Sequence, residues 1–295
     1  MRPVPVDYDA VMKIAAISDI HGNLAALDAV LADIRQRGAD LIVNLGDILS
    51  GPLQPRETAS RLMALDLPTI RGNHERQILE ADRSSMGASD AFADANITAE
   101  QRHWIASLPE QLWLSDEVLL VHGTPGSDLE YFLEVVTASG SRPARQDEAA
   151  RLAGNTPASL ILCGHTHCPR VMQLDDGRLI VNPGSTGLQA YEDSHPFLHR
   201  METGSPHARY AMLERTARGW SARLLGLPMT GMPLRQRPGK MAGRTGALHL
   251  KPDSSVIAAP HDQQPVTSPL RLMTGCCKPS GKHLTTCSYF HHCQR

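Results

Sequence analysis

Short apolar runs that end in glycine-flanked clusters of polar residues constrain the fold of this chain most strongly. Three of them, residues 12–18, 41–45 and 68–71, are too short for helices and are typical of strands buried on both faces. Residues 24–37 and 56–65 lie between them and repeat apolar side chains at helical spacing. This order predicts a parallel sheet with crossover helices, in which ligands gather beyond the carboxyl ends of the strands.

Each strand-like run is followed by residues that can bind a metal or transfer a proton. Two further runs, residues 118–121 and 159–163, end in the same way. In chain order the clusters contain Asp19 and His21; Asp47; Asn73, His74 and Glu75; His122; and His165 and His167. Because the strand ends meet at one edge of the sheet, we expect the five clusters to converge.

The residue types in these clusters indicate a particular chemistry. Imidazole, carboxylate and carboxamide ligands suit manganese, iron, zinc, cobalt or nickel, whereas magnesium and calcium favour oxygen alone. Two such ions about 3.5–4 Å apart can share a carboxylate and a water, lower the pKa of that water toward about 7, and stabilise an in-line displacement at phosphorus. Asp47 stands alone in its loop and is the expected bridge between the ions.

These motifs resemble the signature of the calcineurin-like metallophosphoesterase family, which reads D-x-H, G-D, G-N-H-[DE], a later H, and G-H-x-H. All five elements are present in the family order. The resemblance extends from Met12 to about Leu225 and includes SDIHGNLAAL, GDILSGP, VHGTP and VNPGS. These additional segments are similar to the small bacterial single-domain branch of the family.

The resemblance implies a role for each motif residue. One ion would be held by Asp19, His21, Asp47 and His167, and the other by Asp47, Asn73, His122 and His165. His74 matches the non-ligand histidine that protonates the leaving oxygen or stabilises its charge, and Glu75 is expected behind the ligands. A hydroxide that bridges the two ions would attack phosphorus directly, so Asp47 and His74 are the expected catalytic residues. Manganese is the favoured metal.

The later part of the chain predicts antiparallel pairs. Residues 170–174 and 178–181 are joined by Asp-Asp-Gly, a strong hairpin signal, and residues 207–215 and 220–225 predict a second hairpin. Periodicity alone predicts a mixed α/β domain. Together with the family resemblance, the expected fold is α/β, with two mixed β-sheets packed face to face and flanked by helices in a four-layer αββα sandwich.

Residues 80–109 depart from the alternation of strands and helices. Thr98 and Gln101 resemble a capping box, which predicts a helix over residues 98–107. A surface helix is the favoured interpretation, and a cap over the metal cleft is the alternative. Tyr131 and Phe132 lie in a loop that could shape substrate choice.

Other histidines and cysteines do not fit the motifs. His195, His199 and His207 lack such context and are not expected to be ligands. Cys163 and Cys168 invite a structural zinc site, but no Cys-x-x-Cys pair accompanies them, so packing is the favoured interpretation.

Three segments differ in character along the chain. Residues 1–11 precede the family pattern and are expected to be a non-native N-terminal extension, and residues 12–225 form the predicted catalytic domain. Residues 226–295 are rich in Gly, Pro, Ser and basic residues and are expected to be a disordered, low-complexity tail. The abrupt loss of pattern suggests that this tail is a frameshift product.

Net charge and composition limit the classes of molecule that this chain is expected to bind. A net charge of −2 and 4% aromatic residues argue against a nucleic-acid groove, so a small phosphorylated substrate is expected. No run approaches the roughly 18 apolar residues of a membrane span, and no apolar signal core is present at the N-terminus. We therefore expect a cytoplasmic protein without membrane contact; its oligomeric state is not predicted.

The favoured function is metal-dependent hydrolysis of a small-molecule phosphodiester or phosphomonoester. A dinucleoside polyphosphate hydrolase, which would cleave a phosphoanhydride with the same two ions, is the alternative among enzymes. A non-catalytic scaffold is the alternative outside them, as in the retromer subunit that keeps this fold but has lost key histidines. This chain retains every motif ligand and His74, which favours an enzyme.

Overall fold

The N-terminal β-α-β unit follows directly from the apolar pattern. In the computed structural model, which describes residues 13–229, β1 (Lys13–Ile17) pairs in parallel with β2 (Leu41–Asn44) through α1 (Leu24–Arg37). The Asn23 side chain caps α1 by accepting a hydrogen bond from the Ala26 N–H group at 3.1 Å. One stripe of α1 is buried, formed by Ala26, Leu27, Val30, Leu31 and Ile34.

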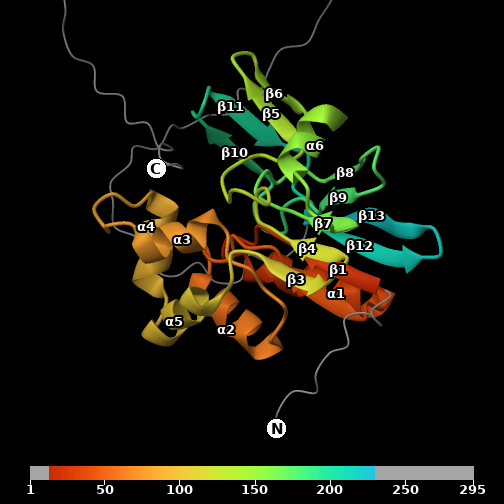
Figure 1. Cartoon of the computed structure of the whole chain (residues 1–295). Helices are drawn as coiled ribbons and strands as arrows, with labels where there is room; N and C mark the ends of the chain where they lie inside the picture. The colour runs from red at the N-terminus through yellow and green to blue at the C-terminus, as the bar shows by residue number, and fades with distance from the viewer. Residues whose placement is uncertain (1–12, 230–295) are drawn as a thin grey trace, which may run out of the picture. The chain divides into compact units, whose positions relative to one another are not determined.

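Two larger sheets contain most of the strands (Figure 1). The four-stranded sheet has the order β13-β12-β1-β2, with β12 (Ala208–Thr216) and β13 (Gly219–Leu227) as an antiparallel hairpin. The five-stranded sheet has the order β3-β4-β7-β9-β8 and comprises β3 (Leu112–Ser115), β4 (Val118–Leu120), β7 (Leu160–Leu162), β8 (Arg170–Gln173) and β9 (Leu179–Asn182). Both sheets mix parallel and antiparallel pairs.

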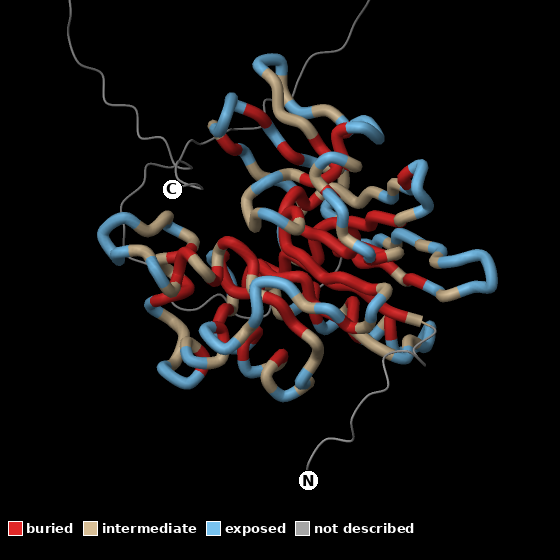
Figure 2. Tube along the Cα trace, viewed as in Figure 1, coloured by how far each residue is buried: buried red, intermediate tan, exposed pale blue. Residues whose placement is uncertain are grey.

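The central strands of the two sheets, β1, β4, β7 and β9, are buried on both faces, which explains their continuous apolar runs (Figure 2). In β1, Ile14 and Ala16 belong to the core between the sheets, whereas Ala15 and Ile17 belong to the core beneath the helices. Leu162 of the second sheet completes the core between the sheets. Helices flank both outer faces, so the predicted sandwich of two mixed sheets is confirmed.

The helices divide unequally between the two outer faces. The apolar core beside the four-stranded sheet includes side chains from α1, α2 (Pro55–Leu65), α3 (Asn73–Glu80), α4 (Ala88–Asn96) and α5 (Ala99–Ser107). The core beside the five-stranded sheet includes side chains from α6 (Gln146–Ala153). Figure 1 shows two small hairpins beyond this sheet, formed by β5 (Glu134–Thr137) with β6 (Gly140–Pro143), and by β10 (Ala190–Asp193) with β11 (His199–Glu202).

Some local predictions are confirmed and others need correction. The helix predicted over residues 98–107 is α5, and Thr98 and Gln101 form the expected capping box. The strand predicted over residues 68–71 is wrong, because only a single parallel bridge joins Thr69 to Asn44. The pairing with β2 stops there because the next N–H group, that of Arg71, donates to the Pro109 carbonyl at 2.9 Å and not to β2.

Two predictions lie wholly or mostly outside the described residues. These are the N-terminal extension over residues 1–11 and the low-complexity tail over residues 226–295, of which the structure describes residues 226–229. The strand β13 ends at Leu227, two residues beyond the predicted limit of the catalytic domain. None of the helices in residues 13–229 is long and apolar enough to cross a membrane.

Candidate metal centre

Backbone hydrogen bonds hold the loops that follow the strands together at one edge of the structure. The Asp19 N–H group donates to the Gly46 carbonyl at 3.0 Å, which joins the loops after β1 and β2. The Gly164 N–H group donates to the His122 carbonyl at 2.7 Å and joins the loops after β4 and β7. The α3 helix begins beside them at Asn73. The predicted convergence of these strand ends is therefore present.

One group of buried side chains contains four predicted ligands. Candidate ligand atoms of Asp19, His21, Asp47 and His167 all lie within 4.8 Å of one another. The Nε2 atoms of His21 and His167 are 3.1 Å apart, and His167 Nε2 is 3.4 Å from Asp19 Oδ1. Within residues 13–229, the buried Asp19 Oδ2 has no hydrogen-bond partner. Convergent imidazole nitrogens and an unsatisfied carboxylate oxygen are the donor set that a transition-metal ion requires.

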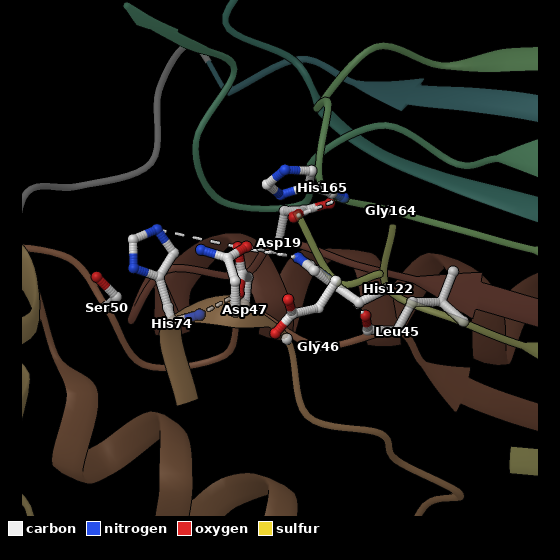
Figure 3. Close-up of polar contacts among 12 residues, drawn as sticks. Asp19, Leu45, Gly46, Asp47, Ser50, His74, His122, Gly164 and His165 are labelled. Carbon is white, nitrogen blue, oxygen red and sulfur yellow. Dashed lines mark hydrogen bonds and ion pairs between the residues drawn. The ribbon is translucent and has the colours of Figure 1, made fainter. Parts of the chain in front are cut away.

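A second group shares one residue with the first (Figure 3). Candidate ligand atoms of Asp47, His122 and His165 lie within 4.8 Å of one another. The Nε2 atom of His122 is 3.2 Å from Asp47 Oδ2 and also 3.2 Å from Asn73 Oδ1, so the carboxamide oxygen faces this group. Asp47 is the residue common to both groups, the position in which a bridging carboxylate is expected.

Backbone carbonyls orient the histidine rings. The Nδ1 atom of His21 lies 2.6 Å from the Ser50 carbonyl oxygen, and that of His122 lies 2.7 Å from the Leu45 carbonyl oxygen. An Nδ1–H donor in these contacts leaves Nε2 as the unprotonated ligand atom. His165 differs, because its Nε2 is 3.0 Å from the carbonyl oxygen of a neighbouring loop residue, Leu129. Its Nδ1 atom is then the available ligand.

Burial favours the metal-binding form of two histidines. It lowers the pKa of His21 to about 4, with a further contribution from the charge of His167. Burial also lowers the pKa of His165 to about 4, assisted by the charge of His122. Both rings are therefore neutral near pH 7, which is the form that coordinates a metal.

The contact between Asp47 and His122 shifts the pKa values of both residues. Burial alone would lower the pKa of His122, but the Asp47 carboxylate outweighs it and raises this pKa to about 9. Burial would likewise raise the pKa of Asp47, yet the charges of His122 and His74 hold it well below its usual range. Asp47 is therefore an anion, and a bound cation would replace the proton on His122.

Most of the predicted ligands have a strained backbone. Positive φ angles of 51° to 68° occur at Asp19, His21, Asp47, His165 and His167. This left-handed conformation costs roughly 1–2 kcal/mol per residue, although Asp and His tolerate it better than bulkier side chains. Its concentration in the residues around one centre is typical of functional sites.

Gly72 allows the backbone to approach the ligands closely. A Cβ atom at this position would lie 2.2 Å from Asp47 Oδ1 and 2.8 Å from His122 Cε1. Glycine is therefore required at position 72, directly before the start of α3.

Glu75 holds the Asp47 loop from behind. Its Oε2 atom accepts hydrogen bonds from the N–H groups of Asp47 at 2.9 Å and Gly72 at 3.0 Å, and its Oε1 accepts from Ile48 at 2.9 Å. Burial, together with the Asp47 charge, raises the pKa of Glu75 despite these hydrogen bonds. The structure thus places Glu75 behind the predicted ligands and in neither group of candidate ligands.

His74 lies beside both groups and has a partner that the sequence analysis missed. Its Nε2 atom is 4.0 Å from Asp47 Oδ2, and its Nδ1 atom is 2.7 Å from Asp90 Oδ1. Asp90 is buried in α4, a helix that was not predicted. No apolar period marked this helix in the sequence, because Asp90 and Asp94 lie on its buried face.

Two tyrosines border the histidine loop. The Tyr191 ring is 4.7 Å from the His167 ring, and its hydroxyl donates to the Tyr131 hydroxyl at 2.7 Å. The Tyr131 hydroxyl is also 3.0 Å from His199 Nε2. His199 thus contacts a tyrosine. Neither group of candidate ligands contains His195, His199 or His207. Cys163 is buried in the apolar core beside α6, and Cys168 is half-buried.

Comparison with known proteins decides the family. A family model described as the calcineurin-like phosphoesterase superfamily domain matches residues 12–204. The chain belongs to this superfamily. Among calcineurin-like relatives, the solved metallophosphoesterase from Sphaerobacter thermophilus is 26% identical, with a TM-score of 0.55, and covers 73% of this chain and 88% of its own. The uncharacterized protein MJ0912 of Methanocaldococcus jannaschii is 30% identical over 203 residues, or 65% of this chain and 76% of that protein.

Membership in the calcineurin-like phosphoesterase superfamily implies a hydrolase of phosphate esters. The buried Asp and His side chains at the edge of the sheets are its candidate metal site.

Proposed function

We propose that the protein hydrolyses a small-molecule phosphodiester or phosphomonoester with two divalent transition-metal ions, of which manganese is favoured. The observation that carries this proposal is the position of Asp47, whose carboxylate belongs to two groups of candidate ligands at once. A site for one ion would not need a carboxylate between two sets of imidazoles.

In this proposal, most residues of the site bind the metal ions, and His74 acts on the substrate. Asp19, His21 and His167 would hold one ion, Asn73, His122 and His165 the other, and Asp47 both. When bound, the ions supply an activated water for attack on phosphorus and neutralise charge on the phosphate oxygens.

His74 acts on the leaving group. Its Nδ1 is held by Asp90 at 2.7 Å, which leaves Nε2 on the side of Asp47, 4.0 Å from Oδ2. From this position the imidazole can donate a proton to the leaving oxygen or stabilise its charge. No serine or cysteine is needed as a nucleophile in this account.

A phosphoanhydride hydrolase is the second candidate. The same ligands would serve, and a cavity lined by Arg71 and Arg76 borders the predicted ligand His122. A non-catalytic scaffold has less support, because the chain retains His74 in a defined position beside Asp47.

A comparison of three substrates tests the proposal. The full chain, loaded with manganese, is assayed with bis-p-nitrophenyl phosphate, p-nitrophenyl phosphate and diadenosine tetraphosphate. We expect hydrolysis of at least one substrate, abolished by a chelator and restored by manganese. His74→Ala should reduce the rate about 100-fold or more, whereas His103→Ala, an exposed histidine on α5, should not reduce it. The absence of metal-dependent hydrolysis of all three substrates would contradict the proposal.

A further inference from the structure

Two tyrosines beside the candidate metal centre contact a predicted ligand from each of its two groups. The Tyr191 ring meets the His167 ring in a T-shaped arrangement, with ring centres 4.7 Å apart and planes at 69°. The Tyr131 ring meets the His165 ring in the same way, at 5.2 Å and 68°. Aromatic rings favour this geometry. Because His167 belongs to one group of candidate ligands and His165 to the other, the tyrosines together contact both groups.

A hydrogen bond joins the two tyrosines into one unit. The Tyr191 hydroxyl donates to the Tyr131 hydroxyl at 2.7 Å, and it also lies 3.3 Å from the backbone carbonyl oxygen of His165. A hydroxyl has a single proton, so the shorter contact is the stronger hydrogen bond. The ring of Tyr191 therefore contacts His167, whereas its hydroxyl contacts His165 and the tyrosine beside it.

His199 holds the other end of this unit. Its Nδ1 atom lies 2.7 Å from the Phe197 carbonyl oxygen, so Nδ1–H donates there and Nε2 of the neutral ring is an acceptor. The Tyr131 hydroxyl is 3.0 Å from this Nε2 atom and donates its proton to it. His199 is buried at the start of β11, and Tyr191 lies in β10 (Figure 1). Both ends of the chain of hydrogen bonds thus belong to one hairpin.

The segment around Tyr131 makes a second contact with His165. The carbonyl oxygen of Leu129 lies 3.0 Å from His165 Nε2. Phe132, the residue after Tyr131, is buried in the apolar core beside α6 and anchors the segment. A partner on the second nitrogen of a ligand histidine sets the tautomer and the orientation of its ring. The carbonyl and the tyrosine ring therefore fix His165 from two directions.

We propose that Tyr131 and Tyr191 are positioning residues of the metal centre, which hold His165 and His167 in the orientations that bind the two ions. The inference rests on the proposed function and deepens it. The tyrosines act through the two histidines, because their hydroxyl groups are bonded to each other and to His199. Loss of the Tyr191 hydroxyl should disturb the ion held by His165, whereas loss of the whole ring should disturb both ions.

Two substitutions at Tyr191 separate the ring from the hydroxyl. Binding of manganese to the metal-free full chain is measured by calorimetry, and His21→Ala and His122→Ala, each of which removes a ligand from one group, assign the two binding steps. Tyr191→Phe should weaken the step assigned to the second group roughly tenfold and leave the other within twofold. Tyr191→Leu should weaken both steps roughly tenfold or more. The visible spectrum of the cobalt-loaded protein, which reports ligand geometry, should change in both variants.

Tyr210→Phe is the matched control. Tyr210 is also buried, and its hydroxyl donates to Asp33, but neither residue belongs to a group of candidate ligands. This variant should lower the Tm of the metal-free protein while both metal affinities stay within twofold and the cobalt spectrum is unchanged. If Tyr191→Leu also lowers Tm but retains both affinities and the spectrum, the tyrosines serve only in packing and the proposal is overturned.

If Tyr191→Leu does not fold, Tyr131→Phe and Tyr191→Phe provide the test, because both break the same chain of hydroxyl groups. Each should weaken the ion of the second group, and the double variant should be no weaker than either single variant. Wild-type affinity in both single variants would overturn the proposal. These measurements need no substrate, so they are independent of the reaction. A chain that hydrolyses no phosphate ester, yet loses metal affinity in these variants, would refute the proposed function and support the role of the tyrosines.

Discussion

The Nδ1 atom of His74 lies 2.7 Å from Oδ1 of Asp90, and this contact joins the first turn of α3 to α4. The carboxylate fixes the ring, so that Nε2 remains on the side of Asp47. Asp90 contacts His74 and belongs to neither group of candidate ligands among residues 13–229, so its role can be separated from metal binding.

Asp90→Asn should lower kcat about 10- to 100-fold while the metal content is unchanged, since the partner of a positioned histidine typically has an effect of this size. The same substitution in a His74→Ala background should cause no further loss, because the two residues act as one unit. Steady-state kinetics and metal analysis on all variants check this. Additive losses would show that Asp90 acts without His74.

His74→Ala and Asp47→Asn should separate catalysis from metal binding. His74→Ala removes a group beside the ligands and should retain both ions while turnover falls roughly 100-fold or more. Asp47→Asn replaces the carboxylate common to both groups with a neutral amide and should also lose metal. Elemental analysis of each variant distinguishes the two effects. Equal metal loss in both would identify His74 as a ligand.

Gly72→Ala should damage the metal centre without adding or removing a charge. The new Cβ would meet Asp47 Oδ1 at 2.2 Å, so the carboxylate or the α3 start must shift. We expect metal affinity and activity to fall at least tenfold, in line with the effect of disturbing the partners of a ligand. Gly226→Ala is the control, because its Cβ would meet no atom closer than 3.5 Å. Unchanged metal affinity in Gly72→Ala would mean that the loop can move freely.

Glu148 should contribute to stability in a pH-dependent way. Hydrogen bonds from the Arg142 side chain and the Arg145 backbone lower its pKa from 4.5 to about 2. A lowered folded-state pKa stabilises the fold above pH 4.5, and this contribution disappears as the pH falls toward about 2. Glu148→Gln should therefore lower Tm at pH 6, and its difference from wild type should shrink between pH 5 and pH 3. A constant difference over that range would contradict the assignment.

The apolar patterning predicted the framework of the fold because burial on both faces leaves a clear signature. The helix over Leu24–Arg37 has the expected bounds, and the strand run before Asp19 is β1. The hairpin around Gly177 forms as β8 and β9, with a positive φ of 92° at that glycine. These features depend on local spacing and turn chemistry, which the sequence contains.

Features that depend on contacts distant in sequence could not be predicted in the same way. The α4 helix is short, and its buried face carries Asp90 and Asp94 in place of apolar residues, so its pattern resembles a polar loop. The strands of the small hairpins β5–β6 and β10–β11 have four residues each, so any alternation in them is too brief to predict a strand. The left-handed backbone of predicted ligands such as Asp19 follows from the surrounding loops, not from residue type.

The stoichiometry of bound metal tests the central claim most directly, because the account requires two ions that share Asp47. The full chain is freed of metal with a chelator, loaded with manganese, separated from unbound ions and analysed by inductively coupled plasma mass spectrometry. The account predicts two manganese ions per wild-type chain. One ion per chain or fewer, in a protein that remains folded, would contradict it.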